Sequence, residues 1–149
     1  MLPPSVTVTE IVVRPNDMDA DRNVNNAVYF EYFHQARLEH LHRLGVYPSL
    51  RREGGAANLF AVAENGCRYR APAYFGDRLE VRTGALALGQ RSFTLVYQVV
   101  RPADGREIAR GRSVQVWLDA EGRSTLIPDP VRELLAASVT TELPDLADQ

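Results

Sequence analysis

Three carboxylates stand close together early in the chain, in a stretch that is also rich in asparagine. The polar side chains of this stretch that could do chemistry are Asp17, Asp19, Asp21, Asn23, Asn25 and Asn26. A carboxylate beside a reacting carbonyl can attack it as a nucleophile or take a proton from water. Aspartates in a loop before a helix are also often caps or solvated residues, so the spacing alone leaves both interpretations open.

Helical periodicity begins where this loop ends and predicts a helix over Ala27–Leu44. One face carries Tyr29, Phe33, Ala36, His40 and Leu44, and the other carries Glu31, Gln35, Glu39 and His42. Asn25 or Asn26 can cap its start, and Gly45 suits its end. The first N–H groups of a helix are unpaired and its dipole is positive there, so they can stabilise a carbonyl oxygen that becomes negative. A carboxylate and such donors together are what acyl-transfer hydrolysis requires.

The elements around this segment are mostly strands. We expect a loop over Asn16–Asn26, another over Tyr47–Asn58 with room for one helical turn, and a short helix over Pro128–Ala137. Strands are expected over Val6–Val13, Leu59–Arg70, Arg78–Leu88, Ser92–Arg101 and Glu107–Leu118, the last three as an antiparallel meander. Asn65-Gly66 could form a hairpin turn; we favour a bulge in one long strand, because Leu59–Asn65 lacks a partner of matching length.

This order predicts an α+β fold in which an antiparallel sheet of about five strands wraps around one long helix. We expect a single domain over residues 1–149, with its core over about 6–137 and a tail, 140–149, that frays.

Composition excludes several classes of protein. The chain has 149 residues, 45% of them hydrophobic, and a net charge of −2, which argues against a nucleic-acid surface. Its single cysteine, Cys67, excludes an intrachain disulfide. The first residues lack a basic start and an apolar run, and no stretch approaches about 18 apolar residues. We therefore expect a cytoplasmic protein without a signal peptide or a membrane span.

The Asp loop and the helix after it resemble a known family. Asp17-x-Asp19, then Val24-Asn25-Asn26-Ala27-x-Tyr29 and Phe30-Glu31-Tyr32-Phe33, is similar to the hotdog-fold acyl-CoA thioesterases of the 4-hydroxybenzoyl-CoA thioesterase type. Tyr69–Val81, Arg91-Ser92-Phe93 and Ala109-Arg110-Gly111 continue the resemblance, which covers roughly Val6 to Pro128. It implies a hotdog fold and the hydrolysis of an acyl-CoA thioester to a free acid and CoA.

The resemblance also implies roles for single residues. Asp19 would be the catalytic carboxylate, Asp17 an acceptor that orders the loop, and Asp21 a solvated residue. The main-chain amide near Asn26 would polarise the thioester carbonyl. Asn23, Asn25 and Tyr29 would contact the substrate. Related acyl-carrier-protein thioesterases carry histidine at the position of Asn23; asparagine can donate a hydrogen bond but cannot shuttle a proton.

Coenzyme A, by the same resemblance, would lie at a subunit interface, in a homodimer that often pairs into a tetramer. Its phosphates would meet the turn at Gln90-Arg91-Ser92, where the guanidinium of Arg91 suits a phosphate and Ser92 lies beside it. A solvated turn arginine is the alternative. No metal or bound cofactor is expected, since CoA is part of the substrate.

Other candidate residues have simpler interpretations. His34, His40 and His42 lie on the helix, and His40 and His42 point to different faces, so they cannot share a metal in the usual i, i+4 geometry. Cys67 reads as a buried strand residue. Glu64 could supply a second carboxylate, but a solvent-facing or paired strand residue is the simpler interpretation. We expect Arg37 to pair with a carboxylate at a subunit or helix–sheet contact, Glu31 and Glu39 being possible partners. Ser92 lacks the Gly-x-Ser-x-Gly context of serine hydrolases.

Two rival functions stay open. One is a hotdog enoyl-thioester hydratase or dehydratase, for which Asn23 in place of histidine is unhelpful. The other is a non-catalytic acyl-CoA-binding module, which would keep the CoA groove and lose the carboxylate, so that Asp19 argues against it. The acyl group cannot be read from the chain. Tyr29, Phe30, Tyr32 and Phe33 could line either an acyl pocket or the core.

Overall fold

The computed structural model describes residues 5–46 and 59–147. Its elements are β1 (Thr7–Val12), the 3-10 turn η1 (Pro15–Asp17), α1 (Val28–Leu44), β2 (Phe60–Tyr69), β3 (Arg78–Leu88), β4 (Ser92–Arg101), β5 (Arg106–Trp117) and α2 (Asp129–Ala136). Each expected strand and helix is confirmed to within one residue at either end. The expected loop over 47–58 lies outside the described residues. In the described ranges, neither helix has the length and apolar content that crossing a bilayer requires.

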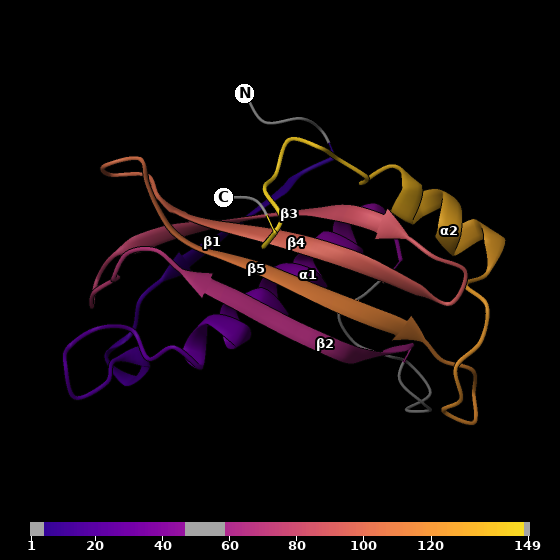
Figure 1. Cartoon of the computed structure of the whole chain (residues 1–149), viewed down its shortest axis with the longest axis horizontal. Coiled ribbons are helices and arrows are strands. Elements are labelled where there is room, and N and C mark those ends of the chain that lie inside the picture. Colours follow the sequence, from indigo (N-terminus) through magenta and orange to yellow (C-terminus); the bar gives the residue numbers. More distant parts are fainter. Residues whose placement is uncertain (1–4, 47–58, 148–149) are drawn as a thin grey trace.

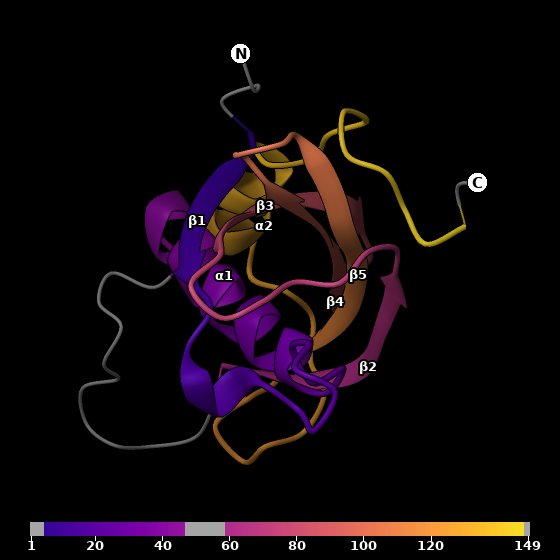
Figure 2. The same ribbon diagram turned by 90° about the vertical axis from the view of Figure 1, so that its left-hand side faces the viewer.

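The five strands form one antiparallel sheet in the order β1-β3-β4-β5-β2. It curls around α1, which packs mainly against β1 and β3, and α2 lies beyond the end of α1 near β3 (Figures 1 and 2). The predicted α+β hotdog architecture and the β3–β4–β5 meander are therefore confirmed. β2 is one long edge strand, as favoured, but its irregular register falls between Val62 and Glu64 rather than at Asn65-Gly66.

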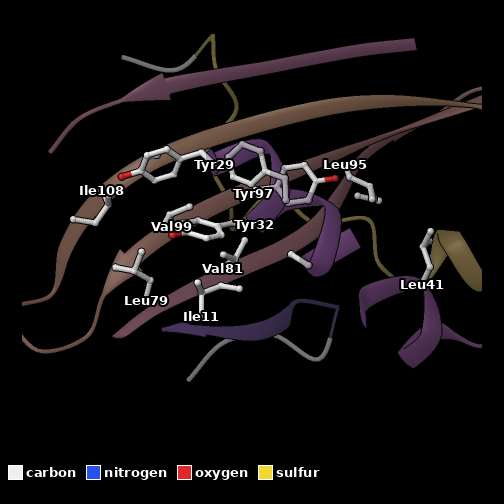
Figure 3. Close-up of a cluster of buried hydrophobic side chains, with 14 of the residues drawn as sticks. Ile11, Tyr29, Tyr32, Leu41, Leu79, Val81, Leu95, Tyr97, Val99 and Ile108 are labelled. Atoms are coloured by element: carbon white, nitrogen blue, oxygen red, sulfur yellow. The ribbon is translucent and has the colours of Figure 1, made fainter. Parts of the chain in front are cut away.

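The core lies in the hollow of the sheet. Side chains from β1, β3 and β4 point there toward α1, among them Ile11, Leu79, Val81 and Val99 (Figure 3). Phe33 of α1 stacks on Tyr97 of β4, with ring centroids 4.7 Å apart and planes 16° from parallel. A side chain at Gly111 of β5 would collide with the ring of Phe33, so this glycine lets the helix lie close to the sheet.

Arg37 departs from expectation. It is 4% exposed and donates hydrogen bonds to Tyr97 Oη at 3.1 Å, to Ser113 Oγ at 3.5 Å and to His34 Nδ1 at 3.4 Å. No ion pair of this guanidinium is found among residues 5–46 and 59–147, so the expected pairing with Glu31 or Glu39 is wrong within one chain, and a carboxylate at a subunit contact stays a prediction. The reason is helical phase: both glutamates are exposed, whereas Arg37 points into the sheet.

The C-terminal segment also differs from its expected frayed state. Residues 140–147 cross the convex face of the sheet, where the chain passes over the strands (Figures 1 and 2). Thr140 N–H donates to the carbonyl of Ala85 at 3.0 Å, and Leu143, 4% exposed, packs with Val96 of β4. A Cβ at Gly84 would lie 2.6 Å from Thr140 Cγ2, so only glycine leaves room for this crossing.

Asp19 lies in a tight loop that the chain builds twice. Asp19 N–H donates to the carbonyl of Asn23 at 2.8 Å, and Asp19 Oδ1 accepts from the amides of Asp21 at 2.8 Å and Asn23 at 3.2 Å. Asp119 does the same: its N–H donates to the carbonyl of Arg123 at 2.8 Å, and its Oδ1 accepts from the amides of Glu121 and Arg123, both at 2.9 Å.

The two loops differ at their fourth residue. Gly122 adopts a φ of 82° in the second loop, where glycine is at ease. Arg22 adopts a φ of 65° in the first, a left-handed conformation that strains a residue with a Cβ. The loop that holds Asp19 is therefore the more strained of the two.

Leu143→Ala should lower the free energy of unfolding by about 2–4 kcal/mol, because it empties a buried site between the tail and the sheet. Leu126→Ala is the control: that side chain is 56% exposed, and its loss should cost less than about 0.5 kcal/mol. Urea unfolding followed by circular dichroism measures both. Equal effects of the two substitutions would mean that the tail is not packed on the sheet.

Arg22→Gly should raise the free energy of unfolding by about 0.5–1 kcal/mol. Relief of left-handed strain, about 1–2 kcal/mol, outweighs the larger entropy of glycine in the unfolded chain. Gly122→Arg, the mirror change in the matching loop, should lower it by a similar amount. Thermal unfolding of both variants tests the pair, and a destabilised Arg22→Gly would contradict the strain.

Candidate active site

Main-chain hydrogen bonds bring the carboxylate loop and the start of α1 together. Asn25 N–H donates to the carbonyl of Asp17 at 2.8 Å, and Val24 N–H donates to that of Ala73 at 3.0 Å. Val28 N–H, at the first residue of α1, donates to the carbonyl of Asn25 at 2.9 Å. Asp19 therefore lies beside the residues that lead into the helix, as the sequence predicts.

Asn25 closes the turn before the helix. Its Oδ1 accepts from Ala27 N–H at 2.9 Å, one residue before α1 begins. Ala27 itself, at the N-cap position, makes no side-chain capping bond. The predicted capping of α1 by Asn25 or Asn26 is therefore wrong: the Asn25 side chain bonds within the turn that precedes the helix. The side-chain oxygen of Asn25 is engaged there, and a role of this residue in substrate binding stays a prediction.

Asp17 is the buried member of the group, at 1% exposure. Its Oδ2 accepts from Tyr32 Oη at 2.8 Å and from Arg14 N–H at 2.9 Å, and its Oδ1 accepts from Arg14 Nη2 at 2.9 Å. Burial alone would raise the pKa of Asp17, but the hydrogen bonds from Arg14 and Tyr32 outweigh it and lower that pKa. This carboxylate orders the loop, in line with its expected role.

Asp19 is exposed, and its two oxygens differ. Oδ1 is held by the two loop amides described above, whereas Oδ2 meets no hydrogen-bond donor in the described parts of the chain. One oxygen thus fixes the carboxylate, and the other is open to a substrate or a water. Asp21, also exposed, points to solvent as expected.

The Asn26 main chain supplies the complementary group. Its N–H has no acceptor among residues 5–46 and 59–147, while its carbonyl accepts from Tyr69 Oη at 2.8 Å. The phenol of β2 thereby fastens the segment that enters α1. A free amide fixed in this way is suited to bind a carbonyl oxygen.

An open pocket of about 290 Å³ lies against this segment. Its lining comes from the loop, the first turn of α1 and the end of β2, namely Asn23, Val24, Asn26, Tyr29, Tyr69, Arg70, Ala71 and Pro72. The fold thus brings three of the sequence-predicted site residues, Asn23, Asn26 and Tyr29, to one pocket. Tyr29 is also tied to the wall by its ring, which meets that of Tyr69 edge-on at 5.4 Å.

The wall from Tyr69 to Pro72 was not among the predicted site residues. The sequence signal for it was weak: a proline soon after a long strand, in the segment Tyr69–Val81 that resembles the family's central strand pair. Its place in the pocket depends on the pairing of β2 with β5 and on the Tyr69–Asn26 hydrogen bond, which join distant parts of the chain.

The other candidate groups do not join this pocket. Burial raises the pKa of Cys67 to about 11, so its thiol is protonated at neutral pH. Burial lowers the pKa of His40 to about 4, and this ring bonds Thr7 Oγ1 at 2.6 Å. Glu64 lies instead beside Leu146 of the tail. Among the described residues, no group of three or more histidine, cysteine or acidic side chains could hold a metal.

Arg91 and Ser92 lie at the opposite end of the sheet. Ser92 pairs with Val116, whereas the pocket end of β2 pairs with Ala109, which faces Val99 of β4. The strand from Ser92 to Val99 spans about 23 Å at roughly 3.3 Å per residue. Arg91 Nη1 donates to the carbonyl of Ser124 at 3.0 Å, and the rest of its exposed guanidinium faces solvent. A single chain does not bring Arg91 to Asp19.

Known proteins resemble this chain over most of its length. It is 26% identical over 132 residues to the long-chain acyl-CoA thioesterase FadM of Escherichia coli, an alignment covering 88% of this chain and 98% of that protein. It is 29% identical to the chloroplastic acyl-acyl carrier protein thioesterase ATL2 of Arabidopsis thaliana, over 83% of this chain but only 64% of the plant protein's length. A thioesterase of Thermus thermophilus, solved with coenzyme A and zinc, superposes with a TM-score of 0.77 at 32% identity, covering 89% and 92% of the two chains.

The sequence model of the thioesterase-like superfamily matches residues 13–135, which include the Asp loop, α1 and the whole sheet except β1. This match confirms the predicted resemblance to thioesterases, and thioesterases of similar sequence support the predicted enzyme class, a thioester hydrolase. The chain belongs to the thioesterase-like superfamily.

Proposed function

We propose that this protein hydrolyses an acyl-CoA thioester to a carboxylic acid and CoA, with Asp19 as the catalytic carboxylate. One observation carries the proposal: two neighbouring residues line one pocket, Asn26, whose N–H has no acceptor among the described residues, and Asn23, whose amide bonds Asp19 Oδ1 and leaves Oδ2 free. These are the groups that acyl transfer from a thioester requires, an attacking or proton-accepting oxygen and a donor for the carbonyl oxygen.

The reaction can follow either of two routes at Asp19. In the first, Oδ2 attacks the carbonyl carbon, the C–S bond breaks with release of CoA thiolate, and water hydrolyses the resulting mixed anhydride. In the second, Oδ2 takes a proton from water while the water oxygen attacks the same carbon; the C–S bond of the resulting tetrahedral intermediate then breaks, and the departing CoA thiolate takes up the proton. In both routes the carbonyl oxygen gains negative charge, which the N–H of Asn26 and the positive end of α1 stabilise.

The pocket wall would position the substrate. Asn23 and Tyr29 would contact the thioester arm, and the rings of Tyr29 and Tyr69 would flank its acyl side. The names of the relatives include both acyl-CoA and acyl-carrier-protein thioesterases. We choose CoA as the carrier because Arg91 offers a guanidinium for its phosphates. No residue of the proposed mechanism calls for a metal or a bound cofactor.

A homodimer would complete the CoA site. β2 is an edge strand of ten residues, most of them exposed, and an open edge of this length invites pairing with another strand. A second copy paired antiparallel along β2 would continue the sheet. It would bring the partner subunit's Arg91 and the start of its β4 to the end of the sheet where Asp19 lies. The pairing of two dimers into a tetramer and the cytoplasmic location stay predictions.

The rival functions find less support. A hydratase of this fold would need a histidine near the helix start, and the three histidines lie further along α1, with His40 buried against Thr7. A module that only binds acyl-CoA would have no use for a fixed carboxylate with a free oxygen, bonded to the pocket residue Asn23. We therefore retain hydrolysis as the function.

Asp19→Asn should lower kcat by at least ~10²-fold with folding intact, because the charge acts mainly in the transition state and the amide oxygen can still accept the loop N–H bonds. Thiol release from a panel of aryl, short-chain and long-chain acyl-CoAs measures it. Asp119→Asn is the matched control, since it removes the same charge from the same turn, and it should leave kcat within about twofold. Asp17→Asn and Asp21→Asn should cost less than Asp19→Asn. Near-normal turnover by Asp19→Asn would refute the assignment.

Arg91→Ala should raise KM for acyl-CoA roughly 10- to 100-fold and change kcat little, since a charge-assisted phosphate contact of about 1.5–3 kcal/mol exists in ground and transition states alike. Acyl-pantetheine, which lacks the nucleotide, should show no such difference. If Arg91→Ala and the parent protein have equal KM values for acyl-CoA, Arg91 is only a turn residue that bonds the carbonyl of Ser124.

Mixing the two variants tests the dimer directly. Suppose that Asp19 and the partner subunit's Arg91 serve one site. Subunit exchange between Asp19→Asn and Arg91→Ala then forms mixed dimers in which one of the two sites keeps both native residues. About a quarter of all sites should therefore regain the KM of the parent protein. If both residues serve the same subunit, no such site arises. Light scattering that shows an active monomer of 16.6 kDa would contradict the dimer itself.

A further inference from the structure

A buried tyrosine of α1 is bonded to the loop that carries Asp19. Tyr32 is 4% exposed, and its hydroxyl donates to Asp17 Oδ2 at 2.8 Å. Its ring meets that of Tyr29 edge-on at 5.6 Å, and both rings lie among the core side chains under the sheet (Figure 3). The donor is thus fixed by a packed helix rather than by another loop.

Asp17 links the fixed Tyr32 hydroxyl to the segments that carry both reacting groups. Its carbonyl accepts from Asn25 N–H at 2.8 Å, next to the free amide of Asn26. Two residues later, Asp19 N–H donates to the carbonyl of Asn23 at 2.8 Å. Asp17 therefore stands between the carboxylate side and the amide side of the site, and a shift of Asp17 would move one relative to the other.

The two side-chain donors to Asp17 are unequal. Arg14 reaches it from the surface, with its side chain 66% exposed, so water screens that ion pair. Tyr32 reaches Oδ2 from the interior, where a hydrogen bond to a charged group is stronger. Without it, Oδ2 keeps the main-chain N–H of Arg14 at 2.9 Å and a longer bond of 3.5 Å from Arg14 Nε. A carboxylate bonded only by Arg14 would move toward water and take the loop with it.

We propose that Tyr32 is a positioning residue of the thioesterase reaction: through Asp17 it sets the distance between the Asp19 carboxylate and the Asn26 amide. This inference rests on the proposed function, in which those two groups meet the thioester carbonyl. Tyr32 itself is not among the residues that line the pocket and acts only through the loop.

Tyr32→Phe removes the hydroxyl and keeps the ring. We expect kcat to fall about 10- to 100-fold, since a displacement of about 1 Å at a reacting centre can cost that much. KM for acyl-CoA should stay within about twofold, because no substrate contact is lost. Amide hydrogen exchange at Asp21 and Asn23, whose N–H groups bond Asp19 Oδ1, should become faster.

Tyr97→Phe is the matched control. It also removes one buried phenol hydroxyl, here bonded to Ser113 and Arg37 in the core, away from the loop. It should lower stability while leaving kcat and the exchange of the Asp21 and Asn23 amides unchanged. A loss of kcat equal to that of Tyr32→Phe would mean that the effect is a general loosening of the core and would overturn the positioning role.

Asp17→Ala gives a second route if Tyr32→Phe does not fold, because it removes the oxygen that accepts from Tyr32. Since both substitutions break one linkage, kcat should fall in Asp17→Ala as well, and the double variant should be little worse than Asp17→Ala alone. Full additivity, or normal kcat in Tyr32→Phe and Asp17→Ala, would overturn the inference. Asp19→Asn separates the two proposals. If Asp19→Asn retains turnover, the proposed function is wrong. If Asp19→Asn is inactive but Tyr32→Phe has normal turnover, only the role of Tyr32 is wrong.

Discussion

The buried carboxylate of Asp17 is the contact on which the candidate site depends. A charge that is 99% removed from water is tolerated only when donors surround it, and here they come from the core of α1 and from the end of the first strand. The same residue binds Asn25 through its main chain. The geometry of the site is therefore tied to the packing of the helix against the sheet, and a loop of polar residues acquires a fixed shape.

Comparison of the two similar loops shows which features of the Asp19 loop belong to the turn itself and which could serve catalysis. Asp19 and Asp119 make the same main-chain bonds, so the hydrogen bonds to Oδ1 say nothing about catalysis. The difference is the surroundings: Asp19 is bonded to Asn23, which lines the pocket near the start of a seventeen-residue helix, whereas Asp119 joins β5 to the segment before α2. The strained φ of Arg22 shows that the first loop keeps its shape even without the glycine that the second one uses.

The sequence allowed the elements and the Asp loop to be predicted because both depend on local patterns. Alternation predicted the strands, and helical periodicity followed by Gly45 predicted the extent of α1. The errors concern contacts between distant residues. The partners of Arg37, the crossing of residues 140–147 over Gly84, and the pocket wall at Tyr69 depend on which strand lies beside which. Periodicity places a residue on a face, but it does not tell what the opposite surface offers.

The proposed reaction requires Asp19 and the Asn26 amide to converge on one carbonyl group, so the structure of a complex tests it most directly. The ligand would be an acyl-CoA analogue in which a methylene replaces the sulfur, which keeps the carbonyl and prevents hydrolysis. We predict the carbonyl oxygen at about 3 Å from Asn26 N, with the carbonyl carbon about 3–3.5 Å from Asp19 Oδ2 or from a water bound to it. A carbonyl held away from both groups, with the ligand otherwise ordered in the pocket, would contradict the account.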